Sequence, residues 1–353
     1  MTDSEVLWRG ENLGQIISRT SEPTEQTLSI LDATVWGSRD TRYRVLGIGE
    51  KLARMRDPSF FVLAEKGVEQ CVFVLDHCIK HIGGQPCGAY HFVMAATLPD
   101  RRDQGFATRM IDVIRPYAER TVGRPGFGFA YVEATTEISL KLSEHTGHAV
   151  EADVPLQLFS RLKPRLSSSV GTIREDEHQG ILLGLKQLYA DHELADFDLS
   201  FFPGETRVFR RNGEITASAQ AEILNWQILS MPGLSGRLLL DALPSIPGWN
   251  RILDLQDLKV VRFGNIYFQE GRAADFFSLA EACLAENNTR VGLVMLDKRS
   301  PVLRALKQAG GFGLLSRAMA GSAKLRIDTV FMDDDLLTTL RTKPLLISPA
   351  DVF

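Results

Sequence analysis

The chain has 353 residues, of which 44% are hydrophobic and 24% are charged, and its formal net charge at pH 7 is −4. This composition is that of an ordinary soluble globular protein, and the length favours two domains over one. The mild negative charge argues against a nucleic-acid partner, because such proteins usually carry a basic surplus. The sequence has no basic region followed by an apolar run at its start and no run of about 18 apolar residues. We therefore expect a cytoplasmic protein with no membrane partner.

The first half predicts strands and helices in alternation. Strands are expected at 58–66, 70–79, 89–98 and 127–134, and helices after Gly105 and at 136–148. Apolar residues at 106, 110, 113/114 and 117 recur at helical spacing, and Pro116 should kink or end that helix near Arg115. Gly147 is a plausible C-cap of the later helix.

Residues 164–172 predict a linker between two domains, because they contain Pro164 and three consecutive serines without strand or helix periodicity. The domains are then 1–163 and 173–353. In the second half we expect helices at 176–193, 271–286 and 300–311, strands at 258–268 and 289–296, and a hairpin at 206–221 that turns at Asn212-Gly213. Strand, helix, strand, helix thus occurs twice. The fold class is α/β or α+β with mixed sheets.

The cysteines do not predict a metal site. Cys71, Cys78 and Cys87 are separated by six and eight residues, and Cys283 is remote. These gaps do not match the usual paired spacing of zinc ligands. We expect free, partly buried thiols in strands.

The segment "LPDRRDQGFATRM" (98–110) has the features of a phosphate-binding loop. A buried strand leads through Pro99 to Gly105 and Ala107 and then directly into a helix. A helix N-terminus supplies about four unpaired N–H groups, and a glycine lets phosphate approach the backbone closely. Arg101 and Arg102 add charge-assisted donors. The alternative is an ordinary turn with solvated arginines.

The longer pattern Pro-Asp-x-Arg-x-x-Gly-x-Ala, between an apolar strand and an amphipathic helix, resembles the cofactor loop of the GNAT acetyltransferases. The resemblance covers about 60–147 and implies twisted, mixed, mostly antiparallel sheets flanked by helices, with acetyl-CoA as cosubstrate. It implies cofactor contacts from Arg102, Asp103, Gln104, Gly105, Phe106, Ala107 and Thr108, with Arg101 beside them and Thr136 at the start of the later helix. Backbone N–H groups near Thr97 and Leu98 would stabilise the thioester oxygen.

The sequence departs from the family in several places. Thr136 stands where many members have an asparagine, and Gly147-His148 replaces the usual Gly-Phe. Ser143 stands where many members have a tyrosine that acts as general acid, and serine is a poorer acid. In the second half, Gly271 and Ala273 match the loop, but Phe268 replaces the arginine and Glu270 would oppose a pyrophosphate. We expect a second GNAT-like domain that has lost cofactor binding, although Arg272 could partly compensate.

Amine acylation requires a base, because an alkylammonium must lose a proton before it attacks. His91 is the first candidate, since family members with a base on this strand place it at the same distance from the loop. Glu133 is the second, and Tyr131 is a candidate hydrogen-bonding partner for substrate or thiolate. The alternatives are a buried structural histidine and a carboxylate paired with Lys141 or a nearby arginine.

The resulting expectation is an acetyl-CoA-dependent N-acetyltransferase acting on a small-molecule or peptide amine. Transfer of another acyl group or to oxygen, and a non-catalytic regulatory acetyl-CoA binder, remain alternatives. The sequence does not identify the acceptor or the oligomeric state.

Overall fold

A computed structural model describes residues 4–10, 14–37, 41–133, 136–197, 201, 205–231, 254–313, 324–330 and 334–351. Contacts divide the chain into two compact units. Unit 1 consists mainly of Met1–Glu151 with Arg326–Thr338, and unit 2 consists of Ala152–Leu325 with Thr339–Val352.

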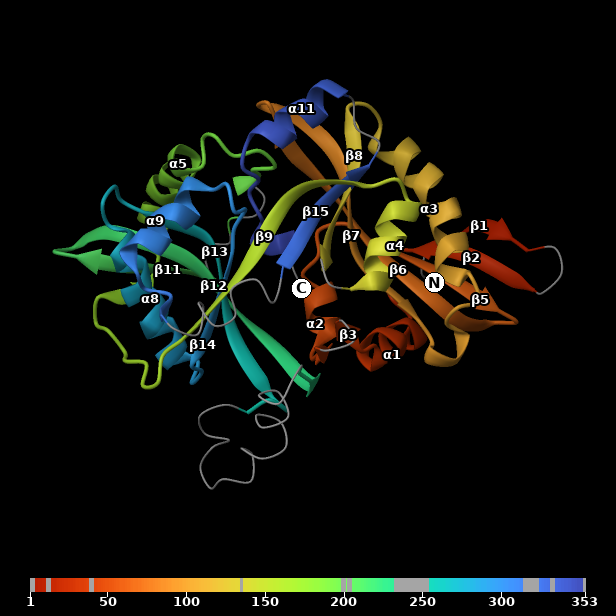
Figure 1. Ribbon diagram of the computed structural model, residues 1–353, viewed down its shortest axis with the longest axis horizontal. Coiled ribbons are helices and arrows are strands. Elements are labelled where there is room, and N and C mark those ends of the chain that lie inside the picture. Colours follow the sequence, from red (N-terminus) through yellow and green to blue (C-terminus); the bar gives the residue numbers. More distant parts are fainter. Residues whose placement is uncertain are drawn as a thin grey trace. The chain divides into compact units, whose positions relative to one another are not determined.

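Unit 1 is built on one sheet (Figure 1). Neighbouring strands are antiparallel from β1 to β7, whereas β7 and β8 are parallel. The sheet order is β1 (Glu5–Arg9), β2 (Gln15–Thr20), β5 (Pro58–Glu65), β6 (Val68–Ile82), β7 (Gln85–Thr97), β8 (Gly126–Glu133) and β15 (Lys324–Val330). The other elements are α1 (Glu25–Ala33), β3 (Trp36–Gly37), β4 (Arg42–Val45), α2 (Ile48–Leu52), η1 (Pro99–Arg101), α3 (Phe106–Val122) and α4 (Glu137–His145).

Helix α3 covers one face of this sheet. Its buried residues recur at helical spacing, and Met110 and Ile114 pack in one cluster with Phe61, Phe73 and Tyr90 of the strands. Burial of this apolar stripe is the main force that holds the helix on the sheet. The predicted amphipathic helix after Gly105 is therefore confirmed.

The prediction that Pro116 kinks or ends this helix near Arg115 is wrong, because α3 continues to Val122. A proline inside a helix removes one N–H donor and crowds the preceding turn. Pro116 lies on the exposed side, however, while Ile114 and Ala118 are buried against the sheet. Burial on both sides of the proline offsets the lost hydrogen bond.

Unit 2 has a second mixed sheet. Its strands are antiparallel except for the parallel pair β13 and β14. The order is β9 (Ala149–Ser160), β14 (Val291–Met295), β13 (Leu258–Phe268), β12 (Glu214–Ser230), β11 (Thr206–Arg211) and β10 (Val170–Thr172). The other elements are η2 (Glu175–Glu177), α5 (His178–Leu188), α8 (Ala273–Glu286), α9 (Pro301–Ala309) and η7 (Pro349–Asp351). Helix α11 (Asp334–Thr342) begins in unit 1 and ends in unit 2. The predicted fold class, mixed and mostly antiparallel sheets flanked by helices, is confirmed.

The hairpin of β11 and β12 turns as the sequence predicts. Asn212 and Gly213 both have positive φ, 53° and 86°. A two-residue hairpin turn of type I′ requires positive φ at both central residues, and Asn-Gly meets this requirement at the lowest steric cost.

The two units share an order of elements and each uses a strand from the other half of the sequence. In each unit a helix joins two parallel strands, α3 between β7 and β8 and α8 between β13 and β14. β9 follows α4 in the chain but pairs with β14, and β15 follows α9 but lies next to β8 (Figure 1). Neither strand was foreseen from the sequence.

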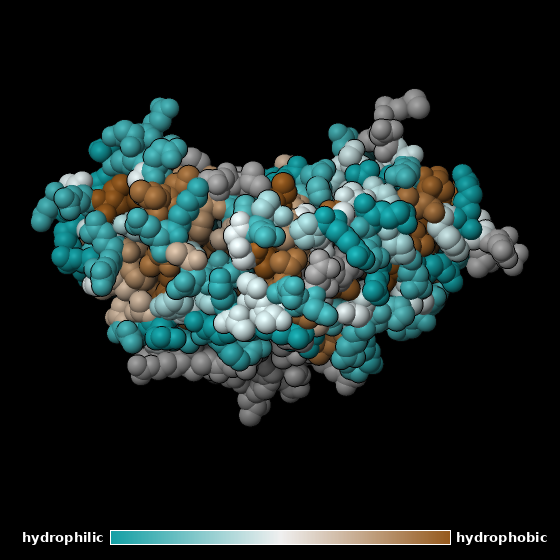
Figure 2. All heavy atoms as spheres, turned by 90° about the horizontal axis from the view of Figure 1, so that it is seen from above, coloured by the Kyte–Doolittle hydropathy of each residue, from teal (hydrophilic) through white to brown (hydrophobic). Residues whose placement is uncertain are grey.

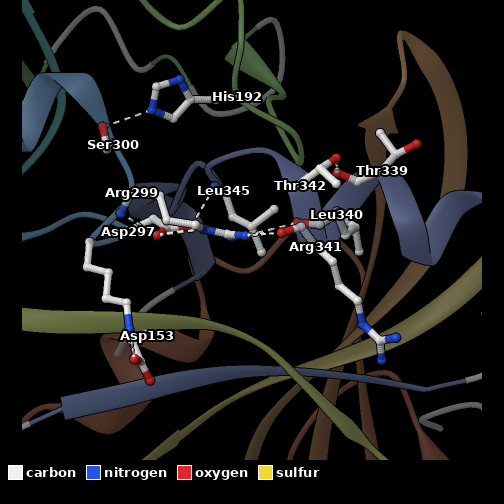
Figure 3. A network of polar contacts seen from close by, with 11 residues as sticks. Asp153, His192, Asp297, Arg299, Ser300, Thr339, Leu340, Arg341, Thr342 and Leu345 are labelled. Carbon is white, nitrogen blue, oxygen red and sulfur yellow. Dashed lines mark hydrogen bonds and ion pairs between the residues drawn. The ribbon is translucent and has the colours of Figure 1, made fainter.

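Within unit 2, Asp297 holds the C-terminal segment in place (Figure 3). Its buried carboxylate accepts hydrogen bonds from the guanidinium of Arg299 and, at 2.9 Å, from the amide of Leu345. Arg299 in turn donates to the carbonyl of Arg341 at 2.8 Å. Lys298 pairs with Asp153 beside this network.

On the face drawn in Figure 2, most side chains are hydrophilic and the hydrophobic ones lie in separated groups. The described helices are all too short or too polar to cross a bilayer.

Candidate functional site

The two parallel strands of unit 1 separate partway along their length. Pairs run from Gly88 with Gly126 to Phe92 with Ala130, and the described strands then continue to Thr97 and Glu133 without further pairing between them. We call the unpaired ends, 93–97 of β7 and 131–133 of β8, the strand fork. The register of β6 against β7 shifts at the same place and leaves Val93 without a partner. A bulge of this kind bends a strand, which accounts for the separation.

A close backbone approach fixes the paired end of the fork. A Cβ added to Gly88 would lie 2.6 Å from the carbonyl oxygen of Val122, the last residue of α3. Only glycine allows this approach. The strands are thereby held together at one end and apart at the other.

The loop from β7 to α3 presents backbone N–H groups at the open end of the fork. Asp103 and Gly105 have left-handed φ values of 62° and 75°, and Gly105 is the N-cap of α3. Within the described residues, no hydrogen bond is made by the amides of Phe106, Ala107 and Thr108. A Cβ on Gly105 would meet no atom within 4 Å, so the space in front of this helix end is open. This arrangement suits an anion.

The two arginines that the sequence predicted as phosphate donors, Arg101 and Arg102, differ in their contacts. Nη1 of Arg101 lies 3.4 Å from Oε2 of Glu65, so part of its charge is already compensated. Arg102 is exposed and forms no hydrogen bond or ion pair with the described residues. Nε2 of Gln104 donates to the carbonyl of Asp100 at 3.2 Å and so closes the loop.

The sequence predicted the backbone amides of Thr97 and Leu98 as oxyanion donors, and the structure leaves only that of Thr97 available. The amide of Leu98 donates to the carbonyl of Gln70 at 3.0 Å and is therefore already used. Amides alternate in direction along an antiparallel strand, so that of Thr97 points to the opposite side, toward β8. The hydroxyl of Thr97 donates to Sγ of Cys71.

The face of the sheet opposite α3 carries the predicted base. His91 is only 3% exposed and stacks on Phe129 with ring centroids 4.7 Å apart, and the ring of Tyr131 meets it edge-on at 5.3 Å. Phe127, Phe129, Tyr131 and Glu133 are alternate residues of β8, and we call them the β8 row. They lie on one face because side chains alternate along a strand. Three of the predicted catalytic residues thus share one face.

Glu133 ends the β8 row and is held by two hydroxyl groups. The hydroxyl of Tyr43 donates to its Oε1 at 2.9 Å, and the hydroxyl of Thr136 donates to its Oε2. Lys141 pairs instead with Glu137, at 2.9 Å. Burial, the charge of Glu133 and this hydrogen bond together raise the pKa of Tyr43 well above its ordinary value. Sequence reasoning missed Tyr43, because no motif marks it and 90 residues separate the two partners.

Ser143 lies on α4, not on the β8 row, and is buried. The helix ends in a Schellman motif, as Gly147 predicts. The amide of Gly147 donates to the carbonyl of Glu144, and that of His148 donates to the carbonyl of Ser143, both at 3.0 Å.

Unit 2 has a loop before α8 that corresponds to the loop before α3. An acidic residue stands in the first turn of α8 where α3 has an arginine. Gly271 has φ of 72° ahead of α8, as Gly105 has ahead of α3. The position that corresponds to Arg109 is Asp275, whose carboxylate accepts from Arg211 at 2.6 Å and from Thr216 at 2.7 Å. Burial raises the pKa of Asp275, but these hydrogen bonds and the charge of Arg211 outweigh it and leave the pKa lowered. A buried anion therefore occupies the first turn of α8.

Other reactive side chains are enclosed. Nε2 of His192 lies 2.8 Å from Oγ of Ser300, and these two residues are 5% and 1% exposed (Figure 3). All four cysteines are free and buried, as expected, although Cys283 lies in α8 and not in a strand. Burial raises the pKa of Cys71 to about 11 and that of Cys283 to about 12, so both thiols stay protonated. In the described ranges, His, Cys, Asp and Glu form no group of three that could hold a metal.

Comparison of the sequence finds no matching family model and no matching curated protein. Comparison of the structure finds N-myristoyltransferase from Saccharomyces cerevisiae. A structure with bound myristoyl-CoA and inhibitors has a TM-score of 0.62 at 9% identity, over 98% of this chain and 88% of the other. A second, with bound myristoyl-CoA, has a TM-score of 0.57 at 9% identity, over 89% and 82%. A GCN5-related N-acetyltransferase from Sphaerobacter thermophilus has a TM-score of 0.44 at 11% identity, over 77% and 80%. The chain therefore has a fold similar to that of N-myristoyltransferase.

Proposed function

We propose that the protein is an N-acyltransferase that takes its acyl group from acetyl-CoA and belongs to the GNAT-fold superfamily. The observation that carries the proposal is the strand fork of unit 1 with the unpaired amides of α3 at its open end. The amides of Phe106, Ala107 and Thr108 would hold the pyrophosphate of coenzyme A, with Arg102 beside them. The thioester would lie between the separated strands. The likeness in fold to an acyltransferase supports this assignment.

In this proposal His91 and two residues of the β8 row, Tyr131 and Glu133, lie next to the acceptor amine and take part in proton transfer. The amine nitrogen attacks the thioester carbonyl, an N–C bond forms, the C–S bond breaks, and the ammonium proton passes to a base. His91 and Glu133 are the candidate bases, and the amide of Thr97 would stabilise the developing oxyanion. Tyr131 and Ser143 are the candidate donors of the proton that the leaving thiolate takes up.

We propose acetyl as the acyl group because of the side chains that fill the paired end of the fork. His91, Phe129 and Phe127 are buried there on one face, and Tyr90 and Met110 are buried on the other. The proposal of a short acyl group such as acetyl is supported by these large side chains at the paired end of the fork. The S. cerevisiae structures hold myristoyl-CoA, so a longer acyl donor is the second candidate.

We further propose that the chain contains two GNAT-like domains, 1–163 and 173–353, joined by the linker 164–172, and that only the first binds the cofactor. In this proposal β9 and β15 are strands that each domain gives to the sheet of the other, and the linker ends in β10, which pairs with β11. The proposed difference in cofactor binding is supported by the charge in the first turn of α3 and of α8. Arg109 stands in α3 where Asp275 stands in α8. An anion near a helix N-terminus competes with a bound phosphate for the same positive end of the dipole.

Thermal melting with acetyl-CoA tests the binding site. Gly105→Glu should abolish the ligand-induced rise in melting temperature. Gly271→Glu is the matched control, because both glycines have similar positive φ and open space beside them. A rise that survives Gly105→Glu but not Gly271→Glu would place the cofactor in unit 2. The same measurement with octanoyl-CoA and myristoyl-CoA shows whether a longer acyl donor raises the melting temperature more than acetyl-CoA does.

Release of free thiol across a panel of primary amines tests the chemistry. His91→Ala should lower turnover at neutral pH far more than it weakens acetyl-CoA binding. Tight binding with no thiol release from any amine would instead identify a regulatory acetyl-CoA binder, the reading that Ser143 in place of a tyrosine favours.

A further inference from the structure

Glu133 is a carboxylate with no cationic partner among the described residues. Its contacts are hydrogen bonds from two neutral hydroxyl groups, those of Tyr43 and Thr136. Glu69 of β6 is held in the same way by the hydroxyls of Thr24 and Thr27, without an ion pair, whereas several other partly or fully buried carboxylates are joined to a cation. Examples are Asp275 with Arg211, Glu177 with Arg210, Asp297 with Arg299 and Glu193 with Lys343. What distinguishes Glu133 from Glu69 is its place in the β8 row, two residues from Tyr131, whose ring meets that of His91.

The two hydroxyls fix the orientation of this carboxylate but do not neutralise it. Tyr43 comes from β4 and Thr136 from the N-cap of α4, and each donates to a different oxygen of Glu133. The pKa of Tyr43 is raised, so the phenol remains a neutral donor. A carboxylate accepts about four hydrogen bonds, and two sites on Glu133 are therefore still available.

Glu133 also lies where an acceptor would approach. It is the last residue of β8, three positions beyond Ala130, where pairing with β7 ends. It belongs to the same row as Tyr131, whose ring meets that of His91. An aromatic ring beside a carboxylate is a favourable environment for an ammonium group, because both attract a cation.

We propose that Glu133, held in place by Tyr43 and Thr136, binds the ammonium form of the acceptor and restricts acceptors to amines that are cationic at neutral pH. Tyr43 is a positioning residue, since it acts through Glu133. The inference names the acceptor class of the N-acyltransferase proposed above and rests on that proposal for its role, but ammonium binding is measured without any acyl donor.

The test compares two probes of similar shape, benzylammonium chloride and benzyl alcohol, by NMR titration of the full chain. The wild type should bind the cation at least about tenfold more tightly, which is the effect of one charged hydrogen bond. Glu133→Gln should abolish the preference, and Tyr43→Phe should reduce it by about threefold or more. Glu137→Gln is the control, because this exposed carboxylate lies four residues away and pairs with Lys141. It should keep the full preference.

Equal binding of the two probes by the wild type, or an unchanged preference in Glu133→Gln, would overturn the inference. Acetyl-CoA melting shifts on the same variants separate the two proposals. If the wild type prefers the cation but shows no acetyl-CoA shift, the proposed function fails and the ammonium site stands.

A kinetic experiment tests the positioning role of Tyr43. With acetyl-CoA bound, Tyr43→Phe should raise KM for benzylamine and leave the melting shift unchanged. KM for aniline, which is neutral at pH 7.5, should stay the same. An equal rise for both amines would overturn the positioning role.

Discussion

Nη1 of Arg109 donates a hydrogen bond of 2.6 Å to Oε1 of Gln15 and so ties the first turn of α3 to β2. The guanidinium also lies over the ring of Trp8, at 5.5 Å from its centroid. Nε2 of Gln15 in turn donates to Glu65 at 2.9 Å, and Glu65 pairs with Arg101. This chain of contacts places two cations next to the candidate phosphate loop and limits their movement.

Arg109→Asp gives unit 1 the charge that unit 2 has at the corresponding position. We expect acetyl-CoA to bind at least about tenfold more weakly, because a negative charge then opposes the phosphates at the positive end of the helix. Isothermal titration measures the change. Arg120→Asp, an exposed position in the last turn of α3, is the control. Similar losses in the two variants would mean that only net charge matters.

Asp275→Ala should destabilise the protein by about 2 kcal/mol, since it leaves Thr216 and Arg211 without their acceptor. Urea denaturation measures the loss, and Glu214→Ala, an exposed change on the neighbouring strand, should cost less than about 0.5 kcal/mol. The pKa of Asp275 is lowered in the folded state. Its contribution is therefore present above the pKa of an unfolded carboxyl and is lost as the pH falls through the folded value. A loss that does not shrink in acid would contradict this account.

Gly88→Ala tests the paired end of the strand fork. The added methyl group would lie 2.6 Å from the carbonyl oxygen of Val122, so backbone must move, and we expect a loss of about 1–3 kcal/mol. Gly49→Ala is the matched control in α2, where the new methyl group meets only Leu28 at 3.9 Å. Alanine is a better helix former than glycine, so that variant should be neutral or more stable. Equal thermal stability of the two variants would mean that the contact is easily relieved.

His192 should make folding sensitive to mild acid. Burial lowers its pKa from 6.5 to about 4, so the unfolded chain binds a proton more readily than the folded one. The stability it contributes is complete above pH 6.5 and falls between pH 6.5 and 4, by at most about 3 kcal/mol. The wild type should therefore lose more stability over this range than His192→Gln in urea denaturation. Parallel losses in the two proteins would contradict a neutral buried histidine.

The local pattern of the sequence was sufficient to predict most helices and strands of the described chain. Alternation and helical spacing located β5, β7, α3, α8 and β13, and Asn212-Gly213 specified its hairpin turn. Pro116 misled the prediction because a local steric preference was outweighed by burial that only the packed sheet supplies. The candidate phosphate loop could be predicted because a strand, a glycine and a helix start are consecutive in the chain.

The sequence by itself determined elements with a clear local pattern, such as α3, β7 and β13, and the loop at Gly105 between β7 and α3. It also placed Tyr131 and Glu133 on one face of β8, because side chains alternate along a strand. Only the tertiary structure decided which strands become neighbours, so that β9 pairs with β14 and β15 joins β8. It also decided that Tyr43 meets Glu133 and that the amide of Leu98 is already used. The reason is that hydrogen bonds between distant segments depend on loop closure and burial of the whole core, and no local periodicity records them.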